Sequence, residues 1–218
     1  MIKSHKELKN KHTNSDIYVL GSGSSLNHIN KTFFNNKIVI GINRVVKSVR
    51  CDYIVSKDAR GFKEVVKHTS DTKIIISKGN CGKLNSPNKP NFDCYIFDHL
   101  AFGPELSPNL NAVGSDNIVI SHSTITSGIH LAAYMGAKNI ILVGHDCGSI
   151  DGEFTVKNYY DKISPTQGSL EKYHQWLTKN IEKHTIDLKN KLIEYYNCNI
   201  VSINPFINLG MEGHIYRK

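Results

Sequence analysis

The stretch DIYVLGSGSSLN, which covers residues 16–27, decides the fold of this 218-residue chain. Its segment IYVL is a run of strand-forming residues that stops abruptly at Gly21, a pattern that predicts a buried strand entering a tight turn. The two glycines of the turn allow a positive φ and a close backbone approach, and the three serines offer hydroxyls and amides at the start of a helix. We therefore expect the turn to bind an anion through Gly21, Ser22, Gly23, Ser24 and Ser25.

The motif in this turn, G-x-G-x-x-L, differs from two common nucleotide motifs. The last glycine of the dinucleotide fingerprint G-x-G-x-x-G is missing, and no Walker lysine follows. Neither an NAD site nor a P-loop is therefore supported. Two interpretations stay open: a turn that binds a nucleotide phosphate, and an ordinary connection whose glycines serve the backbone geometry alone.

Strand-like and helix-like segments alternate through the rest of the chain. Short apolar runs predict strands at 37–42, 52–56, 73–77, 94–97, 138–143 and 199–203. Helices are predicted at 26–34, 61–68, 126–136 and 169–196, the last with a break near Thr185. Residues 1–15 fit a short polar helix or a loose arm. The alternation predicts an α/β, Rossmann-like, mostly parallel sheet with helices on both faces, as one domain over 1–218 with a lid excursion at 148–168.

Polar residues follow several of the predicted strands. In a parallel α/β sheet, ligands bind beyond the carboxyl ends of the strands, where the strand order reverses. The candidates for substrate binding at these ends are Asn43, Arg44, Ser56, Lys57, Asp58, His145 and Asp146. Asp58 has an ordinary alternative, which is to pair with Arg60 or cap the next helix, and Asp146 could instead cap the turn after its strand.

The composition argues against several classes of protein, including nucleic-acid-binding, disulfide-rich and zinc-binding proteins. The net charge of +8 comes mostly from lysines scattered through the chain, which does not indicate a nucleic-acid groove. The five cysteines are scattered and form no C-x-x-C pair, so neither a disulfide framework nor a zinc site is expected. No signal peptide and no apolar run of ~20 residues is visible. We expect a cytoplasmic protein, and this composition is compatible with peripheral association at the inner face of a membrane and with a homo-oligomer.

Four pieces of the sequence together resemble a known family. They are GSGSSL at 21–26, GIN at 41–43, ITSG at 125–128 and GAKNIILVGHD at 136–146. Their order is that of the family 42 bacterial sialyltransferases and of a related domain family, which includes the flagellin motility accessory factors and an archaeal hydroxymethylpterin diphosphokinase. The resemblance extends over residues 17–146.

The resemblance implies roles for several residues. The glycine turn at 21–25 would hold the phosphate or ribose of a CMP-activated sugar, and Asn43 would bind the same donor. Thr126, Ser127 and Gly128 open a small-residue helix, and Ser127 and Gly128 would lie near the donor carboxylate or phosphate. Ser127 could equally cap this helix, and the two roles are compatible because a helix N-terminus is itself an anion site.

The sialyltransferases use a histidine general base and lid tyrosines that bind the leaving phosphate, and they need no metal. By that resemblance, Tyr159 and Tyr160 are the lid tyrosines, and His174 and His184 are the two candidates for the base. A base needs an imidazole with a pKa near neutrality close to the acceptor hydroxyl. The ordinary alternative for each histidine is a solvated or partly packed residue of the long helix.

Three functions are therefore consistent with the sequence. The first is a metal-independent transferase, without a resident cofactor, that moves a sialic-acid-like nonulosonic sugar from a CMP-linked donor to a glycan or protein hydroxyl. The second is a diphosphokinase of the hydroxymethylpterin type, which would hold Mg²⁺ between Asp58, Asp146 and the substrate phosphates. The third is a nucleotide- or sugar-binding module that kept the turn and lost the base.

Overall fold

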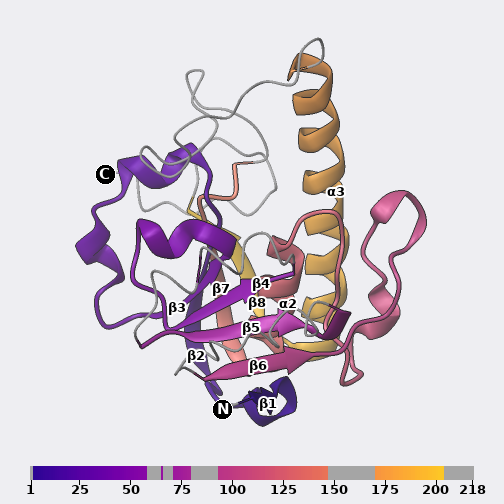
Figure 1. Cartoon of the computed structure of the whole chain (residues 1–218). Helices are drawn as coiled ribbons and strands as arrows, with labels where there is room; N and C mark the ends of the chain where they lie inside the picture. The colour runs from indigo at the N-terminus through magenta and orange to yellow at the C-terminus, as the bar shows by residue number, and fades with distance from the viewer. Residues whose placement is uncertain (1, 58–64, 66–70, 80–92, 147–169, 204–218) are drawn as a thin grey trace, which may run out of the picture.

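A computed structural model describes residues 2–57, 65, 71–79, 93–146 and 170–203, with side chains in the last segment described from residue 179 onward. Eight strands form one sheet in this part of the chain (Figure 1). They are β1 (Ile2–Ser4), β2 (Ser15–Leu20), β3 (Ile38–Ile42), β4 (Tyr53–Ser56), β5 (Lys73–Ser77), β6 (Cys94–Phe97), β7 (Ala137–Val143) and β8 (Asn199–Ser202). The seven strands predicted from the sequence are confirmed, and β1 is an eighth that the sequence did not predict.

The strand order is β1-β6-β5-β4-β3-β2-β7-β8, and every neighbouring pair is parallel. The chain moves outward from β2 through β3 to β6 and then returns to the other side of β2 as β7. The order therefore reverses between β2 and β7, and the predicted Rossmann-like fold is confirmed. In such sheets the crevice beyond the carboxyl ends of the two strands at the reversal is where ligands bind.

The two faces of the sheet carry separate hydrophobic cores. Successive residues of a strand point to opposite faces, so Val19 belongs to the core on one face and Leu20 to the core on the other. The first core is covered by α2 (Ile125–Tyr134) and by α3 (Leu170–Tyr196), the long helix in Figure 1. The second is covered by short 3₁₀ turns: η2 (Ser24–His28), η3 (Lys31–Phe34) and η4 (Asn43–Lys47).

Two predicted helices differ in the structure. The single helix at 26–34 is wrong: Ile29 and Asn30 take extended backbone, and the Asn30 side chain caps η3 by accepting from the amide of Thr32 at 3.0 Å. The break near Thr185 is also wrong, because α3 is continuous. The Thr185 hydroxyl donates to the Ile181 carbonyl one turn earlier at 2.8 Å, so this residue is accommodated without interrupting the helix.

The N-terminal segment is an integral part of the sheet rather than a loose arm or a helix. β1 extends the sheet beyond β6, and the turn η1 (His5–Leu8) follows. Three amides beyond this turn, those of Asn10, His12 and Asn14, donate to the last carbonyls of α2 and of the residues that end it, at 2.8–3.0 Å. The segment thus satisfies the end of a helix that is more than 110 residues away in the sequence. No helix in the described part of the chain is both long and apolar enough to cross a membrane.

Candidate functional site

The first βα junction is bonded directly to the end of β7. The amide of Gly21 donates to the Val143 carbonyl and that of Gly23 donates to the Gly144 carbonyl, both at 2.8 Å. The Ser25 amide donates to Asp146 Oδ2 at 2.7 Å, and the Ser25 hydroxyl donates to Asp146 Oδ1. The two loops that the strand order brings together therefore form one hydrogen-bonded unit.

This unit explains why the turn needs glycine. A Cβ added at Gly23 would lie 2.5 Å from the Asp146 carboxyl carbon and 2.6 Å from the Gly144 carbonyl oxygen. Gly144 itself has a φ of 63°, in the left-handed region that favours glycine. Glycine at these positions lets the loops approach closely enough for Asp146 to reach the Ser25 amide.

The carboxylate of Asp146 occupies the position at which the sequence predicts a bound phosphate. A negative charge near the start of a helical turn is favourable whether a ligand or the protein supplies it. Burial raises the pKa of Asp146, and the hydrogen bonds from Ser25 and Ser24 act in the opposite direction. The amides of Gly21, Gly23 and Ser25 are consequently already used within the protein.

His145 links this unit to α3. Its Nε2 lies 2.8 Å from the Thr185 hydroxyl, and Thr185 already donates its own hydrogen to Ile181. His145 therefore carries its proton on Nε2 and donates it to Thr185. The ring is 5% exposed, and burial lowers the pKa of His145 to about 4, so the imidazole is neutral at pH 7.

His184, one of the two predicted base candidates, precedes Thr185 and is 3% exposed. Burial is the main cause that lowers the pKa of His184, followed by the positive charge of Lys183, so this imidazole is also neutral at pH 7. Its Nδ1 is buried and has no hydrogen-bond partner. Through Ser25, Asp146, His145 and Thr185, the first βα junction is thus connected to the turn of α3 that carries His184.

Asn43, like His184, has a buried side-chain atom without a hydrogen-bond partner. It follows β3, has a φ of 52°, and its Oδ1 is buried without a partner. Among the residues that the structure describes, Asn43 Oδ1 and His184 Nδ1 are the two buried side-chain atoms in this condition. Native proteins leave few buried polar groups unsatisfied, and each needs a reason, such as a ligand.

The turn that leads into α2 is bonded to the residue that follows β4. Lys57, which follows β4, donates from its ammonium to the carbonyls of Ser121 at 2.7 Å and His122 at 3.2 Å. Thr126 and Ser127 are fully buried, and their hydroxyls donate to the carbonyls of Ser123 and Val119 at 2.8 and 2.9 Å. These hydroxyls therefore hold the start of α2 in place.

Gly128 brings α2 close to the end of β3. A Cβ at this position would lie 2.5 Å from the Ile42 side chain, which immediately precedes Asn43. Arg44 is half-buried in η4, and Ser56 is fully buried at the end of β4. The structure thus gathers 21–25, Asn43, Lys57, 126–128 and 145–146 at one edge of the sheet, as the topology predicted.

Several predicted site residues lie elsewhere or outside the description. Asp58, Tyr159, Tyr160 and the lid at 148–168 lie outside the described residues. His174 lies on α3, but the description of that helix includes no side chain at this position.

Two residues near the site have no individual signal in the sequence. Thr185 orients His145, yet its only sequence signal suggested a helix break. His130, fully buried on α2, accepts from the Val119 amide at 2.9 Å and faces the Tyr196 hydroxyl of α3 at 3.3 Å. Burial lowers the pKa of His130 to about 3. A histidine within a small-residue helix gives no indication of such partners.

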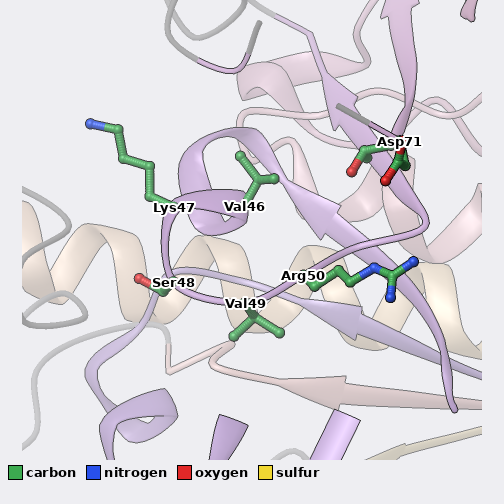
Figure 2. A pocket seen from close by; sticks show the side chains of 7 residues that line it. Val46, Lys47, Ser48, Val49, Arg50 and Asp71 are labelled. Atoms are coloured by element: carbon green, nitrogen blue, oxygen red, sulfur yellow. The ribbon is translucent and has the colours of Figure 1, made fainter. Parts of the chain in front are cut away.

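A separate hollow of about 530 Å³ lies where the chain enters β4 and β5, away from the carboxyl ends of the strands. Its lining residues are Val46, Lys47, Ser48, Val49, Arg50, Asp71 and Thr72. Figure 2 shows the Lys47 side chain extending away from the side that holds Asp71 and Arg50, so the lining charges do not converge. None of the predicted site residues lines it. Within the described ranges, no group of three or more His, Cys, Asp or Glu residues is placed to hold a metal ion.

No protein-family model matches the sequence, and no curated protein sequence matches it. The structure does match solved structures. Campylobacter jejuni sialyltransferase CstII, in complex with the substrate analogue cytidine-5′-monophosphate, superposes with a TM-score of 0.55 and 14% identity over 92% of this chain and 85% of that chain. The monofunctional α-2,3-sialyltransferase Cst-I from the same organism superposes with a TM-score of 0.50 and 15% identity over 91% and 79% of the two chains.

The MAf glycosyltransferase of Magnetospirillum magneticum AMB-1 has a TM-score of 0.53 and 14% identity, over 89% of this chain but 33% of the larger protein. The class that the structure defines is therefore an α/β protein with the Rossmann-like fold of these glycosyltransferases. This match confirms, at the level of the fold, the resemblance seen in the sequence to the sialyltransferases and the motility accessory factors.

Proposed function

We propose that this chain is a glycosyltransferase that moves a sialic-acid-like nonulosonic sugar from a CMP-linked donor to a hydroxyl of a glycan or protein. The observation that carries the proposal is the pair of buried, unpartnered atoms, Asn43 Oδ1 and His184 Nδ1. Both residues were candidates on sequence grounds. The shared fold with a sialyltransferase solved with CMP supports this reading.

In the proposed reaction His184 is the general base. The acceptor hydroxyl oxygen bonds to the anomeric carbon of the donor sugar, and the bond from that carbon to the phosphate oxygen breaks. CMP leaves with the electron pair of that bond, and the hydroxyl proton moves to His184. The lowered pKa supports this role, because a neutral ring at pH 7 has a free lone pair to accept the proton.

The geometry of the junction favours ribose over phosphate beside Asp146. A carboxylate repels a phosphate but accepts hydrogen bonds from sugar hydroxyls. We therefore place the ribose against Asp146 and the leaving phosphate nearer the start of α2, where the helix dipole and the Lys57 ammonium supply positive charge. Tyr159 and Tyr160 stay proposed as further phosphate ligands from the lid segment.

Thermal unfolding with nucleotides tests the proposal. At about 100 times its Kd, a ligand stabilises the protein by about 2.7 kcal/mol, which for a chain of this size raises Tm by about 5–10 °C. We expect this rise with CMP and CDP in the absence of Mg²⁺. Asn43→Ala should reduce it, whereas a substitution at Lys138, exposed near the start of β7 at the opposite end of the strands, should not.

The other functions predict other outcomes of the same experiment. Stabilisation by ATP alone, and only with Mg²⁺, would indicate the diphosphokinase and overturn the transferase. Stabilisation by CMP without any consumption of CMP-N-acetylneuraminic acid would indicate a binding module.

A further inference from the structure

The loop between β6 and α2 carries an unusual pair of exposed apolar side chains. Phe102 is 38% exposed and Leu106 is 44% exposed. The other exposed large apolar residues in the described part of the chain are Ile2, Ile193 and Tyr195. In Figure 1 this loop is the pink segment that projects from the body of the molecule on the side of α3. Two of these five side chains therefore lie on one short loop.

The loop has a defined conformation. Within it, the Gly103 amide donates to the Ser107 carbonyl at 3.0 Å, and the Ser107 amide donates to the Pro104 carbonyl at 2.9 Å. Glu105 and Leu106 have φ values of 53° and 61°, and neither residue favours the left-handed region. Such backbone is unfavourable for residues with a side chain and is concentrated at ligand-binding segments. The strain is a reason to look for a ligand here.

Two contacts hold the loop at the rim of the candidate site. The His122 amide, just before α2, donates to the Leu106 carbonyl at 2.9 Å. The Lys57 ammonium, which also bonds the carbonyls of Ser121 and His122, lies 5.2 Å from the centre of the Phe102 ring. This is within the range of a cation–π contact. Phe102 is therefore attached through Lys57 to the turn that starts α2.

The loop also acts electrostatically on the proposed base. Burial is the main cause that lowers the pKa of His184, and Glu105 is among the charged groups that act on it, in the raising direction. His122, which is bonded to Leu106, acts on the same ring. The strained loop, the turn before α2 and His184 thus belong to one neighbourhood.

We propose that Phe102 is the stacking platform of the acceptor subsite and that it binds a hexose of a glycan acceptor. This assignment rests on the proposed transferase function. The C–H face of a pyranose ring is apolar and its edge carries hydroxyls, so it matches an exposed aromatic ring surrounded by polar groups. Lys57, 5.2 Å from the centre of the Phe102 ring, supplies such a group, and Glu105 follows three residues later in the same loop. One aromatic ring and one leucine beside charged groups do not make the continuous apolar patch that a membrane surface requires, so they fit a sugar better.

Kinetics with a defined acceptor test this assignment. CMP-N-acetylneuraminic acid is the donor and lactose is the acceptor probe, and transfer is measured relative to hydrolysis of the donor by water in the same variant. Phe102→Ala should raise KM for lactose at least tenfold, with a smaller effect on kcat, and lower the ratio of transfer to hydrolysis. Phe102→Trp should retain transfer, because it keeps an aromatic face. Leu106→Ala is the matched control from the same loop and should leave KM unchanged.

Equal effects of Phe102→Ala and Leu106→Ala would overturn the subsite and indicate a general disturbance of the loop. Unchanged lactose kinetics in Phe102→Ala would overturn it as well, as would transfer to a serine- and threonine-containing peptide in place of lactose. A separate readout is tryptophan emission during titration with lactose, taken as the difference between Phe102→Trp and the wild-type chain, whose single tryptophan is Trp176. If the wild-type chain neither binds CMP nor consumes the donor, the proposed function fails. A lactose-dependent emission change would then still support sugar binding at Phe102. Its absence would overturn the assignment of Phe102 together with the proposed function.

Discussion

The first βα junction and the middle of α3 contribute to the same edge of the sheet, but they use their polar groups differently. At the junction, the Ser25 amide and hydroxyl are both bonded to Asp146. On α3, His184 Nδ1 is buried and unbonded. Hydrogen-bonded groups hold loops in place, whereas an unbonded lone pair is free to react. The comparison shows that the glycine turn, the most conspicuous motif of the sequence, uses its polar groups within the protein, and that the unbonded nitrogen proposed as the base comes from a less conspicuous position on α3.

The largest expected effect is the loss of turnover on substitution of His184, the residue proposed as the base. His184→Ala should lower turnover of the CMP-linked donor by a factor of about 10²–10⁴, the usual contribution of a general base. Unfolding free energy should change little through hydrogen bonding, since Nδ1 has no bond to lose. His174→Ala is the control, and a loss of turnover in that variant alone would transfer the role of base to His174.

The pH profile of kcat/KM sharpens the same prediction. Because burial lowers the pKa of His184 below its ordinary value of about 6.5, the rate should fall with acid only below that pH. An acid limb centred above pH 6.5 would contradict His184 as the base.

The next largest effect concerns the closeness of the two loops. Gly23→Ala places a Cβ 2.5 Å from the Asp146 carboxyl carbon, so the loops must separate. We expect a loss of about 1–3 kcal/mol in unfolding free energy, measured by urea denaturation. A Cβ at Gly79 meets nothing within 4 Å, so Gly79→Ala is the matched control with a change of about 0.5 kcal/mol or less. Similar stabilities for the two variants would show that the junction tolerates separation.

A third prediction addresses the carboxylate itself. Asp146→Asn replaces an acceptor by an NH₂ group facing the Ser25 amide or hydroxyl, and it should cost about 1–3 kcal/mol in unfolding free energy. Asp16→Asn, at an exposed position on β2, provides the comparison and should have a smaller effect. If Asp146→Asn were as stable as the wild type, the hydrogen bonds from Ser25 to Asp146 would contribute little to the unfolding free energy.

The last prediction concerns the pH dependence of stability that the buried histidines contribute. The pKa values of His145 and His130 are lowered to about 4 and about 3, so the unfolded chain binds more protons than the folded chain between these values and about 6.5. Stability should therefore fall as the pH decreases from 6.5 to 4, by up to about 1.4 kcal/mol per pH unit for each histidine. His145→Gln should flatten this slope and His99→Gln should not. An unchanged slope in His145→Gln would show that His145 is not the source.

Regular elements were largely predictable because their signals are local. The apolar runs of β2 and β7 and the small residues of α2 are contiguous in the sequence, and the alternation of elements determined the parallel sheet. The 3₁₀ turns η2 and η3 were missed because Ile29 and Asn30 interrupt an otherwise helical pattern. β1 was missed because three residues at a sheet edge gain their pairing only from β6.

Candidate residues for the site could be proposed from the sequence, but their hydrogen bonds could not. Strand ends and the resemblance pointed to Asn43, Asp146 and His184, and polar residues after parallel strands must meet at one edge of the sheet. That Asp146 would bind Ser25, or that Thr185 would orient His145, depends on distances between segments that are 40 or more residues apart.

The amino-acid sequence by itself determined the parallel α/β architecture, the glycine turn after the first strand and the edge at which polar side chains collect. Hydrophobic periodicity and glycine content act over a few neighbouring residues, and the chain carries that information directly. Only the tertiary structure decided which polar atoms are bonded within the protein and which are left unbonded, as at Ser25 and at His184. That distinction depends on which groups meet when distant segments pack, and local sequence holds no record of such distances.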